Sequence, residues 1–447
     1  MTTPLQEVNP SVVAAAPLAD EPELESTPGA PQPSTTRSLV FVYVGYTFRY
    51  LYLAVLVPFY GRVLRASEYG RLLAAMSLFQ IIWIITEYGL PPVGARDVAA
   101  VTSPAGRARV YGRYLAARGL LVPVGLLVGA CATALSPVLR ERPILGALAT
   151  LNGIVVGFNL SWYFQGTLRF KTSVTLEILA FAISLPLILT LVRTPDDTWL
   201  VLLSLLIANS TSTLIQHVIA QRMLDRRAIS ARGGVSALRE STALFMHRGL
   251  TLAMGGSSTY LMSLFAGAAQ VGWYGAAERL INAGLAFLQP ANQVLVGLIY
   301  RRIGSNSTEA AAYGLIRKAL LLLLAFGFAV LIGIQLVGSW AVPRILGPSF
   351  LPSVAVLKAL SFVFPLAALS QVVNSYILIP LRLDRLVTTV SLVSASTTVA
   401  LILTLGPRFG YMGVAMATIL GYLVNVCLLL EVMRRRRLFS KIFSREA

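Results

Sequence analysis

Charged side chains inside apolar stretches are the residues of this sequence that are best placed to do chemistry. Arg49 lies ten residues into one such stretch, and Tyr46 and Tyr52 lie three residues away on either side, on the same helical face. An Arg at the centre of a membrane helix costs about 3 kcal/mol on insertion scales, so it is expected to face protein or water. We expect these three residues to bind an anionic ligand. The alternative is a structural Arg bonded to backbone carbonyls or to a neighbouring carboxylate.

A second polar stripe surrounds Arg279. Glu278 precedes it, and Asn282, Gln289 and Gln293 follow Glu278 at spacings of 4, 7 and 4 residues, which place them on one helical face. A polar stripe in a membrane helix is expected to line a cavity or a helix contact. The alternative is a local charge balance between Glu278 and Arg279 near the membrane surface.

Other polar residues in apolar stretches extend this expected cavity. Gln80 is a further candidate for the lining, and Lys358 either joins it or extends its ammonium group to the membrane surface. Glu87, Glu177 and Glu278 are candidate proton or ion-coupling sites that the sequence does not rank. Amide side chains also recur seven residues apart, and so share helical faces, at Asn152 and Asn159 and at Asn209 and Gln216.

The elements that carry these residues are expected to be membrane helices. Apolar residues make up 56% of the chain, charged residues only 13%, and the mean hydropathy is +0.72. A membrane helix needs about 20 mostly apolar residues. Twelve stretches meet this requirement, at 39–60, 71–90, 114–139, 144–165, 173–192, 199–221, 249–267, 271–299, 320–340, 354–379, 386–405 and 413–432. The sequence predicts an all-α polytopic membrane protein.

The basic residues predict its orientation. If successive stretches cross the membrane in alternating directions, 26 of the 37 Lys and Arg residues fall on one side of the membrane and 8 on the other, and 3 lie within the stretches. Short basic loops stay in the cytoplasm, so both chain ends are expected there. The net charge of +18 is attributed to this bias, and nucleic acid is not an expected partner.

The basic segment 222–248 divides the chain into equal halves. We predict an acidic, Pro-rich cytoplasmic tail at 1–37, a six-helix lobe at 38–221, a basic cytoplasmic linker at 222–248, a second six-helix lobe at 249–433, and a basic tail at 434–447. The stretch that begins at Glu68 resembles the one that begins at Trp273, and GTLRFK (166–171) resembles the residues near Arg382. Two copies of six helices would enclose a central cavity.

Several features argue against enzymatic chemistry. The chain has two cysteines, Cys131 and Cys427, both in apolar stretches, and two histidines. It has no phosphate-binding Gly-rich loop, no HExxH and no Cys/His cluster. The loops on the expected outer side are short and carry few acidic residues. We therefore expect no enzyme, no metal and no cofactor.

Four motif-bearing stretches follow one another along about residues 38–437. They are ASEYGRLLAAMSLFQIIWIITEYGLPPVGARDVAA (66–100), SWYFQGTLRFK (161–171), VGWYGAAERLINA (271–283) and ILGPSFLPSVAVLKALSF (345–362). Together they resemble the Wzx-type oligosaccharide flippases, the polysaccharide-transport branch of the multidrug/oligosaccharidyl-lipid/polysaccharide exporters. WYFQG is the most specific motif. Residues 94–97 depart from the loop expected of a major-facilitator transporter.

The resemblance implies a pair of six-helix lobes in the bacterial cytoplasmic membrane. It implies that a polyprenyl-pyrophosphate-linked oligosaccharide moves from the inner to the outer leaflet by alternating access, for surface polysaccharides such as O-antigen or exopolysaccharide. Arg49 matches the cationic first-helix position that such flippases tend to have. The implied partners are the lipid-linked glycan, the bilayer, and polysaccharide polymerase or export proteins.

Two other functions compete with this one. The first is cation-coupled export of small amphiphiles or drugs, although drug-exporting relatives tend to carry an acid in the first helix, which this sequence lacks. The second is a non-transporting membrane scaffold for glycan assembly, docked through the acidic tail.

Overall fold

The computed structural model describes residues 35–286, 295, 299, 309–436 and 438, with their side chains except at 35–47, 49–50, 226, 247, 250–255, 309–312 and 384. All regular structure among these residues is helical, which confirms the predicted all-α class. Eight helical stretches are long and apolar enough to cross a membrane. The total of twelve membrane spans and their orientation stay predictions.

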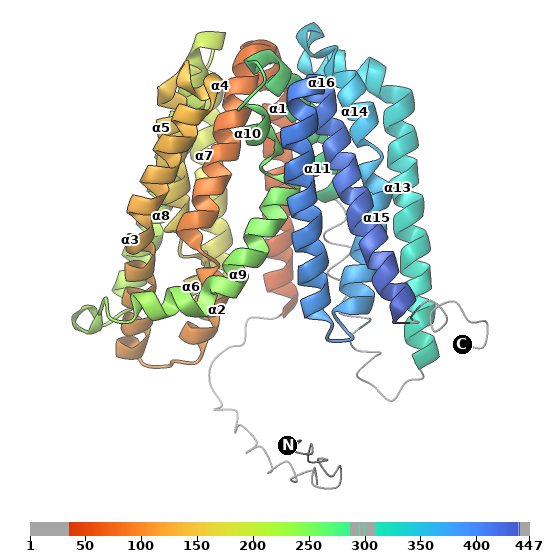
Figure 1. Cartoon of the computed structure of the whole chain (residues 1–447). Coiled ribbons are helices and arrows are strands. Elements are labelled where there is room, and N and C mark those ends of the chain that lie inside the picture. Colours follow the sequence, from red (N-terminus) through yellow and green to blue (C-terminus); the bar gives the residue numbers. More distant parts are fainter. Residues whose placement is uncertain (1–34, 287–294, 296–298, 300–308, 437, 439–447) are drawn as a thin grey trace, which may run out of the picture.

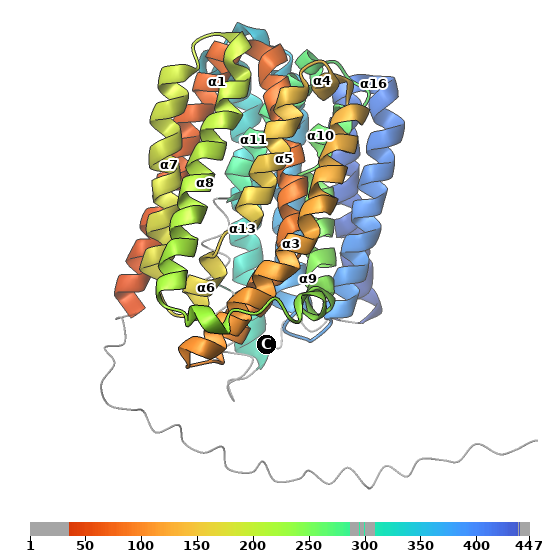
Figure 2. The ribbon, with the colours of Figure 1, turned by 90° about the vertical axis from the view of Figure 1, so that its left-hand side faces the viewer.

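Helices α1, α3, α5, α7 and α8 form a first bundle in which each packs on its neighbours (Figures 1 and 2). Helix α1 contains a break at Arg65, where φ is 57°, so it comprises the first two predicted helices. The bounds of this part are α1 Thr35–Glu87, α2 Leu90–Ala99, α3 Pro104–Leu135, α4 Pro137–Arg140, α5 Pro143–Gly157, α6 Ser161–Gly166, α7 Phe170–Leu191, η1 Pro195–Asp197, α8 Thr198–Arg222 and η2 Arg226–Ala228.

Helices α11, α13, α14, α15 and α16 form a second bundle (Figure 1). Helix α16 also contains a break, at Gly410, so it comprises the last two predicted helices. The bounds of this part are α11 Ala268–Ala286, α13 Glu309–Leu346, η3 Pro348–Phe350, α14 Ser353–Leu360, α15 Val363–Val372, the π-helix η4 Val373–Leu378 and α16 Asp384–Arg435.

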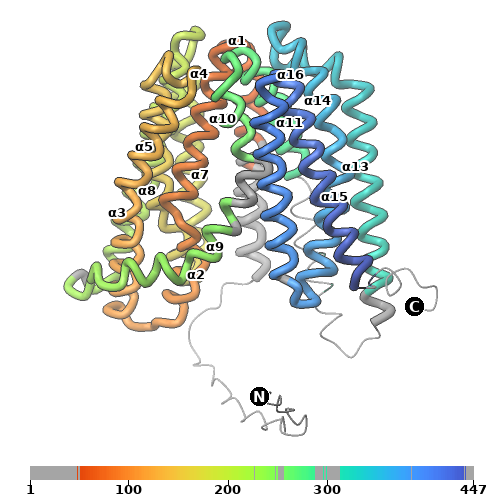
Figure 3. Tube along the Cα trace, viewed as in Figure 1, coloured from red at the N-terminus to blue at the C-terminus, as the bar shows by residue number. Residues whose placement is uncertain are grey.

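Helix α9, Gly234–Gly255, joins the bundles and differs from the helix predicted at 249–267. It begins inside the basic segment, contacts α2 and α3 of the first bundle, and then packs on α16 of the second (Figure 3). The helix ends at the pair Gly255–Gly256, because glycine weakens a helix interior. The hydroxyl of Ser77 donates a 2.7 Å hydrogen bond to the carbonyl of Gly256. The short helix α10, Ser258–Met262, follows.

Equivalent turns end the fourth and the tenth predicted helices. After α6, Leu168 has a φ of 58° and the amide of Arg169 donates to the carbonyl of Phe164 at 2.7 Å. After η4, Arg382 has a φ of 55° and the amide of Leu383 donates to the carbonyl of Leu378 at 3.0 Å. Both turns have the six-residue hydrogen bond of a Schellman motif. Their likeness supports the predicted similarity between the two halves.

The two bundles touch most closely where α1 crosses α11. A Cβ added at Gly70 would overlap the carbonyl oxygen of Ala268, and one added at Gly272 would overlap the carbonyl oxygen of Ala66. Each helix therefore contributes a small residue, three intervening residues and a glycine, which is the pattern that lets membrane helices approach backbone to backbone. This crossing holds the bundles together at one end of the molecule.

We call that end the closed side, and the end where α1 begins and α16 ends the terminal side (Figure 1). Hydrogen bonds join the bundles near the closed side. The hydroxyls of Ser136 and Ser263 lie 2.8 Å apart, and the hydroxyl of Tyr260 donates to the carbonyl of Ala132 at 2.9 Å. Toward the terminal side the ribbons of the two bundles diverge (Figure 1).

The crossing can be tested with alanine at its glycines. We expect Gly70→Ala and Gly272→Ala each to destabilise the detergent-solubilised protein by about 1–3 kcal/mol, because the new methyl group meets backbone atoms that cannot turn aside. Gly333→Ala in α13 is the matched control, since a Cβ there meets no atom within 4 Å. Thermal unfolding measures the effect. Equal melting temperatures for all three variants would contradict the crossing.

Candidate functional site

A cavity of about 500 Å³ lies inside the first bundle. This volume falls in the usual range for small-molecule sites. Its walls come from α1, α2, α5, α6, α7 and α8, with one residue from α11 of the second bundle. Its polar lining residues are Tyr52, Gln80, Glu87, Asn152, Asn159, Ser161, Gln165, Glu177, Ser184, Asn209, Ser212, Thr213 and Arg279.

Five of the residues predicted to bind or couple meet in this cavity. They are Tyr52, Gln80, Glu87, Glu177 and Arg279, which come from three different helices. Arg279 belongs to α11 of the second bundle, and its Nη2 lies 2.8 Å from the sulfur of Met76 on α1. The second bundle thus contributes a cation to a cavity that the first bundle otherwise forms.

Hydrogen bonds fix the polar groups of the lining. The hydroxyl of Tyr52 lies 2.9 Å from that of Ser184. The amide of Asn209 donates to the side-chain oxygen of Asn152 at 3.2 Å, and Asn152 donates to the carbonyl of Leu202 at 2.9 Å. Partners that hold these amides in place preorganise them for a polar ligand.

Aromatic rings form much of the remaining wall. The rings of Tyr52 and Phe181 lie 4.7 Å apart, and those of Phe79 and Trp83 are stacked at 6.3 Å. All four residues line the cavity. Flat apolar surfaces beside fixed amide and hydroxyl groups match a ligand that has both apolar faces and hydroxyl groups, as sugars do.

Arg118 is an important residue that lies within the predicted helix at 114–139 but was not among the candidate site residues. It lies in α3 and is buried, with 2% of its surface exposed. Its Nη1 donates to the carbonyl of Asn159 at 2.9 Å, and its guanidinium carbon lies 5.7 Å from the ring centre of Trp162. The carbonyl belongs to the break between α5 and α6, so Arg118 stabilises the segment that carries the WYFQG motif. Its spacing of four residues from buried Tyr114 was the available signal.

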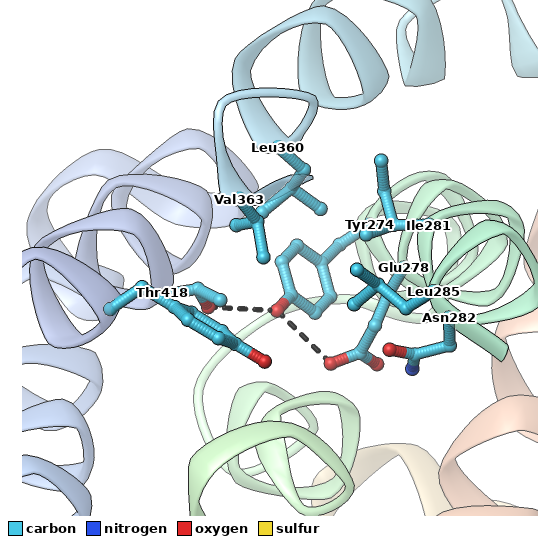
Figure 4. Close-up of a pocket in the computed structure, with 9 residues that line it drawn as sticks. Tyr274, Glu278, Ile281, Asn282, Leu285, Leu360, Val363 and Thr418 are labelled. Atoms are coloured by element: carbon cyan, nitrogen blue, oxygen red, sulfur yellow. Dashed lines mark hydrogen bonds between the residues drawn. The ribbon is translucent and has the colours of Figure 1, made fainter. Parts of the chain in front are cut away.

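A second, smaller pocket surrounds Glu278 (Figure 4). Its volume of about 20 Å³ leaves room for about one water molecule. The hydroxyl of Thr259 donates to one carboxylate oxygen of Glu278 at 2.5 Å, and that of Tyr274 donates to the other at 3.2 Å. The hydroxyl of Tyr274 also lies 3.1 Å from that of Thr418 on α16.

The structure places the described part of the predicted polar stripe and the neighbouring Arg279 in two different sites. Glu278 and Asn282 line the smaller pocket, whereas Arg279 lines the cavity. Consecutive residues of a helix point about 100° apart, so Glu278 faces the second bundle and Arg279 the first. Among the described residues no ion pair joins Glu278 directly to Arg279, and the alternative of a charge balance between these neighbours stays open.

The remaining predicted residues lie elsewhere or outside the described residues. Lys358 lies half-buried in α14 and lines neither of these sites. The side chains of Tyr46 and Arg49 lie outside the described residues, as do Gln289 and Gln293 entirely, so their roles stay predictions. Within the described residues no His, Cys, Asp and Glu cluster could hold a metal ion.

Known proteins resemble this chain in sequence and fold. The family described as polysaccharide biosynthesis protein matches residues 36–301. A Shigella dysenteriae protein named as a candidate O-antigen transporter is 20% identical over 363 residues, which cover 80% of this chain and 90% of that protein. The lipid II flippase MurJ, in an inward closed conformation, has a TM-score of 0.67 at 11% identity over 89% of this chain and 87% of its own. An inward-facing multidrug resistance MATE family transporter has a TM-score of 0.61 at 13% identity, with coverage of 92% and 100%.

Thiol labelling can test which of the two sites holds water. With Cys131 and Cys427 replaced by alanine, we expect Gln80→Cys and Asn209→Cys to react with a membrane-impermeant maleimide, because a polar cavity of this volume fills with water. Thr418→Cys is the control, because Thr418 is buried beside the smaller pocket. Labelling of Thr418→Cys without labelling of the other two variants would contradict the expectation that the larger cavity holds water.

Proposed function

The chain belongs to the polysaccharide biosynthesis protein family, and on that premise we propose that it is a flippase for a polyprenyl-pyrophosphate-linked oligosaccharide in the bacterial cytoplasmic membrane. It moves the repeat unit from the inner to the outer leaflet by alternating access, for O-antigen or exopolysaccharide assembly with the polymerase and export proteins of that process. One observation carries the proposal: Arg279 reaches from the second bundle into an aromatic and amide-lined cavity of the first.

The chemistry of Arg279 supports a diphosphate ligand. A guanidinium group presents paired N–H donors that match phosphate oxygens and stays charged at all physiological pH values. Met76, which contacts Arg279, lies eleven residues from the break at Arg65, and that is about 16 Å along the helix. This depth is close to the middle of a membrane core of about 30 Å. Arg49 is proposed as a further cation for the same headgroup, whereas Lys358 does not line the cavity and is not assigned to it.

The arrangement of the bundles supports alternating access. They meet at the Gly70–Gly272 crossing on the closed side and diverge toward the terminal side (Figure 1). We assign the terminal side to the cytoplasm from the distribution of basic residues, so the cavity receives substrate from the inner leaflet. The likeness in fold to the lipid II flippase MurJ supports a lipid-linked cargo.

Export of cationic amphiphiles is the competing function, because two carboxylates, Glu87 and Glu177, line the cavity. Arg248 pairs with Glu87 at 2.5 Å, and Arg279 adds a further positive charge to the lining. Because the two arginines offset the charges of the two carboxylates, this cavity favours an anionic headgroup with a neutral glycan over a cationic drug.

Complementation of a deletion strain tests the flippase proposal. We expect Arg279→Ala to lower surface glycan roughly tenfold or more, since a charged hydrogen bond contributes about 1.5–3 kcal/mol. Arg279→Lys keeps the charge and part of the activity. Arg408→Ala, exposed beside the break in α16, is the control and restores export fully. Full export by Arg279→Ala, or a deletion strain that gains only sensitivity to cationic dyes, would overturn the proposal.

Glu278 is proposed as the proton-coupling residue, ahead of Glu87 and Glu177. Its carboxylate accepts hydrogen bonds from the hydroxyls of Thr259 on α10 and Tyr274 on α11, and Figure 4 shows that the Tyr274 hydroxyl also contacts Thr418 of α16; within the described residues Glu278 has no ion pair. Glu87 in contrast is neutralised by Arg248. A carboxylate that hydroxyl groups hold, rather than an ion pair, can gain or lose a proton in a nearly dry pocket without breaking an ion pair.

Transport in proteoliposomes tests this coupling. Glu278→Gln keeps the size of the side chain but cannot change charge, so we expect transport driven by an imposed proton gradient to fall to the rate seen without a gradient. Substrate binding at equilibrium should persist, because Arg279 is untouched. Glu431→Gln, on the terminal side of α16, is the control and should respond to the gradient as the unaltered protein does. A full gradient response in Glu278→Gln would exclude Glu278 as the coupling residue.

A further inference from the structure

Arg248 of α9 lies at the edge of the cavity. Its Nη1 lies 2.5 Å from a carboxylate oxygen of Glu87, and its guanidinium carbon lies 5.9 Å from the ring centre of Trp83. Both partners line the cavity. The Arg248 side chain is 37% exposed and that of Glu87 is 13% exposed. The ion pair is therefore open to water on the side of Arg248.

The position of Arg248 does not depend on its ion pair. Tyr88 and Gly89 both adopt left-handed backbone conformations, with φ of 49° and 65°, so the chain turns sharply at the end of α1. The ring of Tyr88 stacks on that of Phe245 at 4.2 Å, and a Cβ at Gly89 would lie 2.7 Å from the amide nitrogen of Phe245. These contacts hold α9 against α1 one turn away from Arg248. The guanidinium can thus exchange partners while the helix stays in place.

Arg248 and Arg279 contact the cavity at two depths. Arg279 touches Met76 and Arg248 touches Glu87, eleven residues further along α1, a separation of about 16 Å along the helix. A single diphosphate group is too short to contact both cations. A headgroup that approaches from the terminal side meets Arg248 before it reaches Arg279.

We propose that Arg248 is the first contact of the anionic headgroup, and that phosphate oxygens displace the Glu87 carboxylate from its guanidinium. Within the described residues only Nη1 of this side chain donates a hydrogen bond, so its other donors remain for a bidentate phosphate contact. Glu87 competes with the ligand for the same cation. This inference rests on the proposed function and adds a second, shallower anion-binding position to it.

Binding to purified full-length protein in phosphatidylcholine nanodiscs tests the inference, with a radiolabelled polyprenyl diphosphate as the probe. We expect Arg248→Gln to weaken binding about tenfold, since a charged hydrogen bond is lost. Glu87→Gln should tighten binding roughly threefold or more because the competing carboxylate is gone. The double variant should bind as Arg248→Gln does. Arg239→Gln, exposed on the same helix, is the matched control and should bind as the unaltered protein does.

The same variants distinguish a headgroup contact at Arg248 from a purely structural ion pair. A structural ion pair predicts no gain for Glu87→Gln, and a gain that persists in the double variant would overturn the role of Arg248. If Arg248→Gln does not fold, two other variants still test the proposal. Glu87→Gln must tighten binding of the probe, and Arg248→Lys must keep most of the affinity of the unaltered protein. If phosphatidylglycerol displaces the radiolabelled probe as strongly as unlabelled polyprenyl diphosphate does, Arg248 binds anionic lipid in general and its assignment to the substrate headgroup is overturned.

Arg279→Gln distinguishes failure of the Arg248 contact from failure of the proposed function. If Arg279→Gln loses affinity for the probe while all Arg248 and Glu87 variants bind normally, only the shallow contact is wrong. If Arg279→Gln also binds normally, the cavity does not bind the diphosphate and the proposed function itself fails.

Discussion

The close crossing of α1 and α11 is the contact on which the rest of the structure depends. Without a hydrophobic driving force between helices inside lipid, two bundles stay together only where their backbones approach closely or hydrogen bonds join them. Gly70 and Gly272 supply the approach, and pairs such as Ser136 and Ser263 supply the hydrogen bonds. Because these contacts gather at the closed side, the bundles are free to diverge toward the terminal side (Figure 1).

Burial of polar groups in the first bundle follows the same constraint. An unsatisfied polar group in the membrane core is costly, so each polar wall residue that shapes the cavity needs a partner behind it. Asn152 meets this need with the carbonyl of Leu202, and Arg118 meets it at the break before α6. The WYFQG motif is thereby explained as a wall segment: Trp162, Tyr163 and Phe164 are buried. The motif therefore maintains the shape of the cavity, and its Gln165 adds an amide to the lining.

The sequence was sufficient for the helical class, for the family, which the family match confirms, and for some of the polar residues of the cavity lining, such as Gln80 and Arg279. These depend on composition and on helical spacing, which are local properties. The sequence was insufficient where a contact between distant segments determines the local structure. The start of α9 at Gly234 depends on its packing against α2 and α3, and Arg118 is buried because a carbonyl 41 residues away needs a donor. The opposite faces of Glu278 and Arg279 required knowing which bundle lies on each side of α11.

The opposite orientations of Glu278 and Arg279 connect the two sites physically. Glu278 and Arg279 are neighbours on one helix, yet Glu278 lines a pocket that α14, α15 and α16 of the second bundle also line, whereas Arg279 enters the cavity of the first. A helix moves its side chains together, so any shift of α11 against the second bundle also shifts Arg279 relative to the cavity wall. The same helix carries Gly272 at the crossing. A change of charge at Glu278, an anion at Arg279 and the contact that closes one side of the molecule therefore all act on a single 19-residue element. Within the proposed function, α11 is the shortest physical route by which proton binding and headgroup binding can influence which side of the membrane the cavity faces.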